Sequence, residues 1–305
     1  MALALACAGL RAAAQAAQEP PSATQAPSRP GADPELVILY ATVVNDSGNY
    51  VASLREDNFT IMEDKVEQKL SLFRLEDAPM SIGVILDVSG SMLNKIDKSR
   101  LAVLQFLRAA NPHGEYFLVT FNGHAELSNP FTNSVDDIKS RMEFVEAKGL
   151  TALLDAIYLG LSQMRVARNQ KKAMLLISDG GDNHSRYSEQ EVRKFVRETD
   201  TQIYAIAPQN PPGSPLTPED LDGAYLLEEL TKMSGGGTFV VANLSDLPAM
   251  AVRIGMALRN QYVLGYRPSN RARDGKWRKI NVKLRLPKGS PHLNVYAKSG
   301  YYSPR

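Results

Sequence analysis

The sequence is poor in cysteine and in long apolar runs, and these shortages exclude several classes of protein. Cys7 is the single cysteine among 305 residues, so the chain can form neither an internal disulfide nor a metal centre built from several thiolates. No apolar run approaches the ~20 residues that a membrane-spanning helix needs, so we expect no transmembrane segment.

Histidines are few and phosphate-binding motifs are missing. The four histidines show neither a metal-ligand spacing nor the arrangement of a catalytic triad: His113, His124, His184 and His292. The sequence also lacks a glycine-rich loop of the P-loop or dinucleotide-binding type. We therefore predict that the protein is not an enzyme.

Acidic groups are nearly missing from the C-terminal segment. Residues 253–305 contain thirteen Lys or Arg against one acid, Asp274, which gives the segment a net charge of about +12. The whole chain carries +2, so the remainder carries about −10. Such a basic block could contact a polyanion, but no nucleic-acid motif accompanies it, and we predict no nucleic-acid partner. We favour basic strands that pack against an acidic segment containing Glu56, Asp57, Glu63, Asp64, Glu67, Glu76 and Asp77.

The N-terminal residues look like a secretion signal followed by a tether. Residues 1–17 are apolar at first and then rich in small residues, so we interpret them as the remnant of an export signal. The alternative is the alanine-rich tail of a cytosolic protein. Residues 18–34 contain five prolines and cannot build a core, so we expect a linker. We predict a secreted or periplasmic protein of the cell envelope.

Two β-rich segments flank a central region in which strands and helices alternate. Residues 35–78 have the pattern of a small antiparallel unit, with a tight turn at Asp64-Lys65. Residues 79–260 place short apolar runs between amphipathic helical stretches. Residues 261–305 return to β character and carry most of the basic block.

The alternation determines the expected fold. Ile82–Leu86 is a nearly continuous apolar run, which suits a strand covered on both faces. Ser188 and Glu191 have the spacing of a capping box at the start of a helix. We predict an α/β fold with a doubly wound, mostly parallel, Rossmann-like sheet, flanked by a small β-sandwich in which 35–78 pairs with 261–305.

Oxygen-bearing side chains gather where the predicted strands end. Asp87, Ser89 and Ser91 follow the first apolar strand, Asp179 follows the third, and Thr151 begins the helix before that strand. In doubly wound sheets these strand ends form the ligand-binding edge. Oxygen ligands without sulfur or imidazole favour a hard cation, which would be Mg²⁺, Mn²⁺ or Ca²⁺.

Each of these side chains also has a purely structural interpretation. The two aspartates could order turns, the two serines could bond the loop backbone, and Thr151 could cap a helix. Their joint placement at matching strand ends favours the metal site. Three nearby residues are candidates for supporting contacts, with capping or solvation as the alternative: Asp155, Asp182 and Asn183.

Residues 80–260 resemble a von Willebrand factor A domain, and the five oxygen ligands match its metal-ion-dependent adhesion site. The whole chain is similar to bacterial von Willebrand factor A-related proteins known mostly from acidobacterial genomes. The residues that carry this likeness are Asp57-Asn58-Phe59, Glu63-Asp64, Gln261–Tyr266 and Gly300-Tyr301-Tyr302. At two positions, Lys65 and Leu150, glycine is usual: a positive φ would strain Lys65, and Leu150 could narrow access to the metal.

The resemblance implies how such a site would work. Ser89 and Ser91 would bind the metal directly, Thr151 directly or through water, and both aspartates mainly through water. One position would stay open for an Asp or Glu carboxylate of a partner protein. The resemblance also implies that partner binding shifts the last helix, residues 247–259. The expected function is therefore a divalent-metal-dependent, adhesion-type protein-binding module.

Two functions of other classes remain as alternatives. One is a structural envelope scaffold with a vestigial metal site. The other is a Mg²⁺-dependent hydrolase of the aspartyl-phosphate type, which would need an acid two residues after Asp87, where Ser89 stands. The proline-rich 208–218 loop leaves the carboxyl end of a strand, so it either rims the partner surface or is a solvated excursion.

Overall fold

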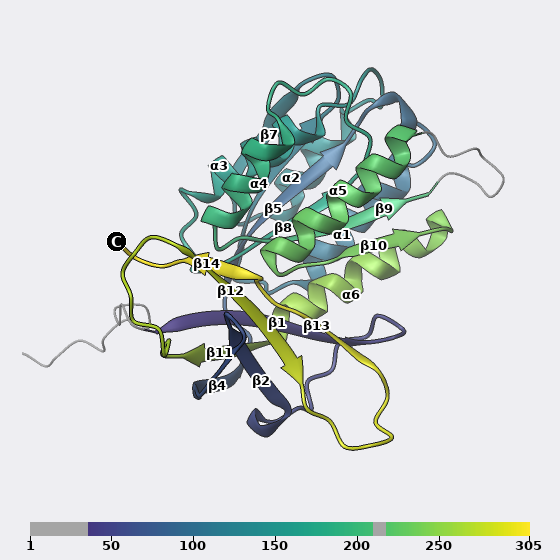
Figure 1. Ribbon diagram of the computed structural model, residues 1–305. Coiled ribbons are helices and arrows are strands. Elements are labelled where there is room, and N and C mark those ends of the chain that lie inside the picture. Colours follow the sequence, from purple (N-terminus) through teal and green to yellow (C-terminus); the bar gives the residue numbers. More distant parts are fainter. Residues whose placement is uncertain (1–35, 210–217) are drawn as a thin grey trace, which may run out of the picture. The chain divides into compact units, whose positions relative to one another are not determined.

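A six-stranded sheet forms the centre of the α/β region (Figure 1). The computed structural model describes residues 36–209 and 218–305. In sheet order, the strands are β10 (Thr238–Val241), β9 (Gln202–Pro208), β8 (Lys171–Ile177), β5 (Met80–Asp87), β6 (Glu115–Phe121) and β7 (Ala125–Thr132). All neighbouring pairs are parallel except β6 with β7. Every residue of β5, β6 and β9 is buried, as expected for parallel strands covered on both faces.

Several predictions fall outside the described residues. These are the export signal at 1–17, the linker at 18–34 and most of the proline-rich 208–218 loop. Within the described ranges, no helix combines the length and apolar character that crossing a bilayer requires.

Three helices cover each face of the sheet. One face carries α1 (Ile96–Ala109), α2 (Val135–Glu143) and α6 (Leu247–Arg259), and the other carries α3 (Leu153–Met164), α4 (Glu189–Glu198) and α5 (Pro218–Ser234). Successive side chains of β5 point to opposite faces: Val84 and Leu86 join the first core, and Ile85 joins the second. The doubly wound, mostly parallel arrangement confirms the predicted fold class.

The predicted capping box at the start of α4 is also confirmed. The hydroxyl of Ser188 accepts a hydrogen bond from the backbone N–H of Glu191, and the Glu191 carboxylate accepts one from the backbone N–H of Ser188. Both backbone donors lie in the first turn, where they have no partner inside the helix. The local sequence therefore suffices to start this helix.

The N- and C-terminal β segments build one sandwich. Its first sheet has the order β13 (Leu293–Tyr296), β1 (Val37–Asn45), β11 (Gln261–Tyr266) and β4 (Leu70–Glu76). The second has the order β14 (Gly300–Tyr302), β12 (Trp277–Leu284), β2 (Phe59–Glu63) and β3 (Val66–Gln68). Leu39 and Tyr262 from the first sheet share a core with Ile61 and Val282 from the second. The predicted sandwich is therefore present.

The antiparallel pattern expected of residues 35–78 is present, and its strands are divided between the two sheets of the sandwich. β1 pairs with β11 and β13, and β2 pairs with β12 and β3, so β1 and β2 lie in different sheets. The few N-terminal strands offer too little apolar surface to form a core alone, and the C-terminal strands supply the rest. Strands β7 and β14 were not predicted. β7 carries Pro130 and several polar residues, which an edge strand tolerates.

Buried polar groups join the sandwich to the α/β sheet. The Gln261 side-chain amide, at the start of β11, donates to Thr42 Oγ1 of β1 at 2.8 Å and to Gln202 Oε1 of β9 at 2.7 Å. Thr42 Oγ1 also lies 3.0 Å from the hydroxyl of Tyr204 in β9. Because β11 follows α6 directly, this network anchors the chain where the helical region ends.

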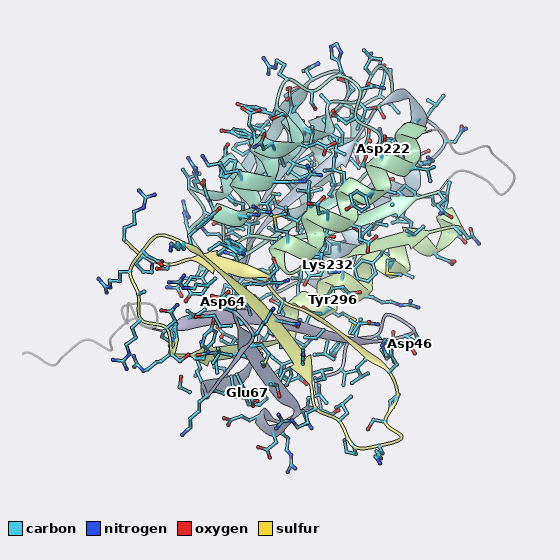
Figure 2. The ribbon with its side chains drawn as sticks, in the orientation of Figure 1. Asp46, Asp64, Glu67, Asp222, Lys232 and Tyr296 are labelled. Carbon is cyan, nitrogen blue, oxygen red and sulfur yellow. The ribbon has the colours of Figure 1, made fainter. Side chains whose placement is uncertain are left out.

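The acidic and basic segments meet at two ion pairs among the described residues. Arg285 pairs with Glu67 at 3.5 Å, and Arg259 pairs with Asp77 at 2.6 Å. Figure 2 labels Glu67 on the sandwich. The prediction that the basic C-terminal segment packs against the acidic N-terminal segment is therefore partly confirmed. Lys279 and Lys283 on β12 are exposed and form no ion pair within the described chain, so contact with a polyanion stays a prediction.

Candidate metal centre

The candidate site lies at the carboxyl edge of the sheet, next to the central strand β5. From β5 the chain first adds β6 and β7 on one side, and later β8, β9 and β10 on the other. Such a reversal of strand order leaves a crevice between the loops that follow the two central strands. Here those loops are residues 88–95, after β5, and residues 178–188, after β8.

Asp87 is the deepest of the predicted ligands. Its Oδ1 accepts the backbone N–H of Ser89 at 2.9 Å, and its Oδ2 accepts the hydroxyl of Ser178 at 2.6 Å. Burial raises the pKa of Asp87 to about 6, although both hydrogen bonds lower it; the nearby charge of Asp179 raises it further. A buried anion with only two hydrogen-bonding neighbours is costly, and a bound cation would relieve that cost.

The two serines lie together at the start of the loop. Ser89 Oγ and Ser91 Oγ are 3.1 Å apart; Ser89 is buried and Ser91 is exposed. Their hydroxyls bond each other and not the loop backbone, unlike the structural alternative considered above. The backbone N–H of Gly90 donates to the carbonyl of Gly149 at 3.0 Å, which brings this loop against the segment before Thr151.

Thr151 is held by its backbone and not by its side chain. Its N–H donates to Asn183 Oδ1 at 2.9 Å, and its carbonyl accepts the N–H groups of Asn183 and His184. The residue that caps α3 is Ala152, so Thr151 does not cap this helix, which begins two residues later than predicted. Among the described residues its hydroxyl has no hydrogen-bond partner, so the oxygen is available to a ligand.

Asp179 pairs with a lysine that the sequence analysis did not identify. Lys95 Nζ lies 2.9 Å from Asp179 Oδ2, and the two side chains are 4% and 12% exposed. Asp179 therefore does not serve as a turn residue through its side chain. A lysine four residues after Ser91 gives no pattern that distinguishes it from a solvated charge. Its burial follows from the short 3-10 turn that places it before α1.

The three supporting residues tie the 182–187 loop to the start of α3. Asp155 Oδ1 accepts the N–H groups of Arg186 and Tyr187, and Asp182 Oδ1 accepts the Leu154 N–H at 3.3 Å. Asn183 holds Thr151, as described above. These three side chains make structural contacts one layer behind the predicted ligands.

The residues present fit a hard divalent cation. The contacts Gly90–Gly149 and Asp87–Ser178 join all three loops that carry the five predicted ligands. Those ligands are two carboxylates and three hydroxyls, a set of oxygens that suits Mg²⁺, Mn²⁺ or Ca²⁺. No group of three or more His, Cys, Asp or Glu side chains that could hold a metal occurs in the described ranges, so a metal at these five residues stays a prediction.

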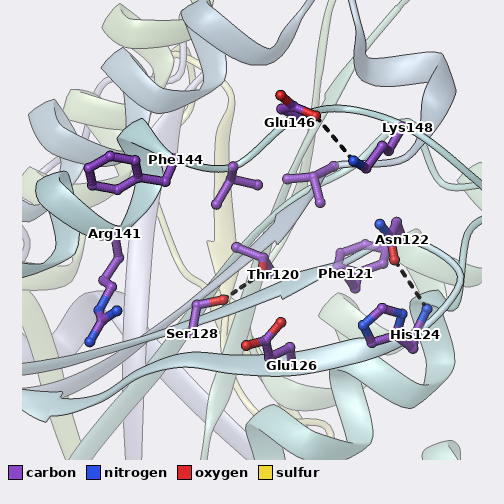
Figure 3. A pocket seen from close by; sticks show the side chains of 12 residues that line it. Thr120, Phe121, Asn122, His124, Glu126, Ser128, Arg141, Phe144, Glu146 and Lys148 are labelled. Atoms are coloured by element: carbon purple, nitrogen blue, oxygen red, sulfur yellow. Dashed lines mark hydrogen bonds and ion pairs between the residues drawn. The ribbon is translucent and has the colours of Figure 1, made fainter.

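A pocket of about 330 Å³ opens beside this edge (Figure 3). Val88, the residue after Asp87, lines it. Its other walls come from β6, β7 and the turn between them, and from α2 and the segment after it. Phe144, which is 85% exposed, stands at this pocket together with the charged Arg141 and Lys148. The sequence analysis missed this pocket because its lining residues form no recognisable motif, and strand β7, which supplies part of the wall, was not predicted.

Comparisons with known proteins agree with this architecture. The family model of the von Willebrand factor type A domain matches residues 82–181. Inter-alpha-trypsin inhibitor heavy chain H4 from Bos taurus is 25% identical over 136 residues, which cover 40% of this chain and 15% of that protein. A von Willebrand factor type A structure from Catenulispora acidiphila is 10% identical, with a TM-score of 0.51 over 81% of this chain and 75% of that one.

BatB from Bacteroides thetaiotaomicron is 20% identical, with a TM-score of 0.47, and covers 58% of this chain and 98% of its own. The matched stretch spans only 15% of the bovine relative, so that protein's activity does not transfer to this chain. Residues 82–181 include the strand ends, loops and side chains of the candidate site. The chain therefore carries a von Willebrand factor type A domain.

Proposed function

We propose that this protein is a divalent-metal-dependent protein-binding module. Domains of this type are in general protein-interaction modules, and the metal dependence and the site are our proposal. Asp87, Ser89, Ser91, Thr151 and Asp179 would hold Mg²⁺, or else Mn²⁺ or Ca²⁺. The cation would supply an electrophilic position for an Asp or Glu carboxylate of a partner protein.

The observation that carries the proposal is that three loops, which bear carboxylate and hydroxyl oxygens, meet beside the carboxyl end of β5. Within the described residues, the Thr151 hydroxyl forms no hydrogen bond, the two serine hydroxyls lie 3.1 Å apart, and the Ser89 side chain also hydrogen-bonds the Asp87 carboxylate. The buried Asp87 carboxylate lies directly behind them. The Thr151 hydroxyl can therefore serve as an oxygen ligand beside a buried carboxylate, which supports a hard cation.

The proposal includes no catalytic activity. A serine nucleophile needs a positioned base. Among the described residues, no histidine side chain hydrogen-bonds a site hydroxyl, and the single lysine at the site is paired with Asp179. A Mg²⁺-dependent hydrolase is therefore the less favoured alternative. A structural scaffold with a vestigial site is the other one.

We also propose that the protein acts in the cell envelope or in the secreted fraction. The support for this location is the apolar, small-residue composition of residues 1–17 followed by a proline-rich stretch. Fractionation of cells that express the full chain tests the location, because a protein found only in the cytosol would contradict it.

Isothermal titration with Mg²⁺, Mn²⁺ and Ca²⁺ tests the metal site. We expect one binding event per chain in the wild type and its loss in Asp87→Ala and Asp179→Ala. Asp97→Ala is a matched control because that carboxylate is 89% exposed on α1, outside the predicted ligand set. Absence of binding by the wild type, or unchanged binding by Asp87→Ala, would favour the scaffold.

A pull-down comparison tests the partner. Wild-type protein and Asp179→Ala are used as baits, each with Mg²⁺ and with EDTA. We expect a protein retained by the wild type with Mg²⁺ and lost under the other three conditions. A partner retained equally with EDTA would bind elsewhere on the chain, and the metal-dependent mode would be wrong.

A further inference from the structure

Lys95 is a fixed positive charge inside the candidate metal site. Its Nζ lies 2.9 Å from Asp179 Oδ2, and its side chain is only 4% exposed. The backbone around it is rigidly held: its N–H donates to the Met92 carbonyl, and its own carbonyl accepts the N–H and the hydroxyl of Ser99. These bonds fix the position from which the side chain leaves the backbone, and the ion pair with Asp179 holds the ammonium group in the site.

The charges near the site can be counted from its contacts. Asp87 and Asp179 contribute two negative charges, and Lys95 contributes one positive charge. One layer away, Arg186 pairs with Asp155 at 3.3 Å, and Asp182 accepts the hydroxyl of Ser185. The inner groups therefore sum to −1 without a divalent cation and to +1 with one.

We infer that Lys95 sets the net charge of the metal site. With this lysine, the site binds a divalent cation less tightly than it would without it, and the metal-loaded site then binds one carboxylate of a partner. This inference rests on the proposed function. The ammonium group repels a divalent cation that shares Asp179, which weakens metal binding. The loaded site is left at +1 in a partly buried environment, and a single carboxylate from a partner neutralises it.

A purely anchoring role for Lys95 makes the opposite prediction. If the lysine only oriented Asp179, its removal would leave that carboxylate disordered and metal binding would weaken. If it sets the charge, its removal tightens metal binding and weakens binding of a carboxylate to the loaded site. The signs of the two changes therefore distinguish the two roles.

The first experiment measures Mn²⁺ and Mg²⁺ affinity by isothermal titration. We expect Lys95→Met to bind either metal about tenfold more tightly than the wild type, since a repulsive charge is removed at close range. Lys95→Arg keeps the charge and is expected to stay within about threefold of the wild type. Lys98→Met is the matched control, because Lys98 is exposed one turn along the same helix, and no change is expected.

The second experiment uses acetate as the carboxylate probe. Paramagnetic relaxation of the acetate methyl protons reports their approach to Mn²⁺ bound to the protein. We expect Lys95→Met, loaded with Mn²⁺, to bind acetate about tenfold more weakly than the loaded wild type, because its site is neutral and not positive. Lys98→Met should bind acetate as the wild type does.

The outcomes separate this inference from the proposed function. If the wild type binds neither Mn²⁺ nor Mg²⁺, the metal site itself is wrong. If the wild type binds metal but Lys95→Met binds it equally or more weakly, only the role given to Lys95 is wrong. Circular dichroism and thermal melting without metal confirm the fold of each variant. Lys95→Gln, whose amide can still donate to Asp179, replaces Lys95→Met should that variant not fold, with the same expected signs.

Discussion

The hydroxyl of Ser178 donates a 2.6 Å hydrogen bond to Oδ2 of Asp87, and both residues are buried. This bond joins the end of β8 to the end of β5 across 91 positions of sequence. Ser178 Oγ also accepts the backbone N–H of Gly180 at 3.1 Å, so one hydroxyl orients a predicted ligand and the loop that carries Asp179. Ser178 thus supports the candidate site without belonging to the proposed ligand set.

Replacing Ser178 by alanine should weaken both the fold and the site. The change removes a donor from a buried carboxylate, and we expect a loss of about 1–3 kcal/mol in the free energy of unfolding, measured with urea. The pKa of Asp87 should rise above the wild-type value of about 6, because one of the hydrogen bonds that lower it is lost. Ser290→Ala, at an exposed position, should change stability by less than about 0.5 kcal/mol. Equal stability of both variants would contradict this account.

Replacing Asp87 by asparagine should abolish metal binding while leaving the metal-free protein equally or more stable. Burial raises the pKa of Asp87 from 3.8 to about 6, so between these values the folded chain binds more protons than the unfolded chain. Stability of the wild type therefore falls as pH rises through this window. At pH 7 in EDTA, the free energy of unfolding of Asp87→Asn should exceed that of the wild type by on the order of 1–3 kcal/mol. The fall of stability with rising pH should be absent in this variant.

Urea unfolding at pH 4.5 and pH 7 checks this expectation, with the exposed Asp97→Asn as its control. If Asp87→Asn lost more stability at pH 7 than the control, the Asp87 carboxylate would stabilise the fold. The expectation that this buried charge lowers the free energy of unfolding would then be wrong.

Replacing Lys65 by glycine should stabilise the sandwich. Asp64 and Lys65 both have positive φ, 47° and 71°, in the two-residue turn between β2 and β3. This confirms the strained backbone expected at Lys65, because a β-carbon disfavours this region. Lys65→Gly should raise the free energy of unfolding by about 0.5–1 kcal/mol. Lys65→Ala keeps the β-carbon, and an equal gain in that variant would mean that strain is not the cause.

Replacing Lys171 by methionine should change the alkaline pH dependence of stability. Lys171 is buried at the start of β8, and burial lowers its pKa to about 8, although the charges of Glu76 and Asp77 oppose this shift. Lys171 Nζ also donates to the carbonyl of Glu76 at 3.4 Å and lies 5.8 Å from the centroid of the Tyr40 ring. Between pH 8 and 10.5 the unfolded chain binds more protons at this lysine, so its contribution makes stability rise with pH.

Lys171→Met should lack that rise. Thermal melts between pH 8 and 9 measure it, because most tyrosines of the unfolded chain are still protonated in this range. At pH 7 the variant should be at least as stable as the wild type, because the cost of a buried charge is gone. Lys194→Met, at an exposed position of α4, should keep the wild-type slope. Parallel pH profiles for Lys171→Met and the wild type would refute the assignment.

The sequence by itself determined the type and order of most elements in the helical region. Apolar runs such as Ile82–Leu86 and the capping box at Ser188 carry their own physical signal, because burial on two faces and the satisfaction of first-turn donors are local requirements. The same patterns placed Asp87, Ser89, Ser91 and Asp179 after the ends of strands and Thr151 near the start of a helix. Strand β7 escaped prediction because Pro130 and its polar neighbours satisfy an edge position without producing a periodic pattern.

Only the tertiary structure decided which distant groups meet. β1 lies between β11 and β13 because the sandwich needs apolar surface from both ends of the chain, and no local pattern encodes that pairing. The contacts Ser178–Asp87 and Lys95–Asp179 join loops more than eighty residues apart, and they depend on parallel strands lying side by side. The sequence thus determines which residues supply oxygen atoms to the candidate site. The folded structure determines the burial, charge state and hydrogen-bond partners of those oxygens, because the desolvation of a group depends on the residues packed around it.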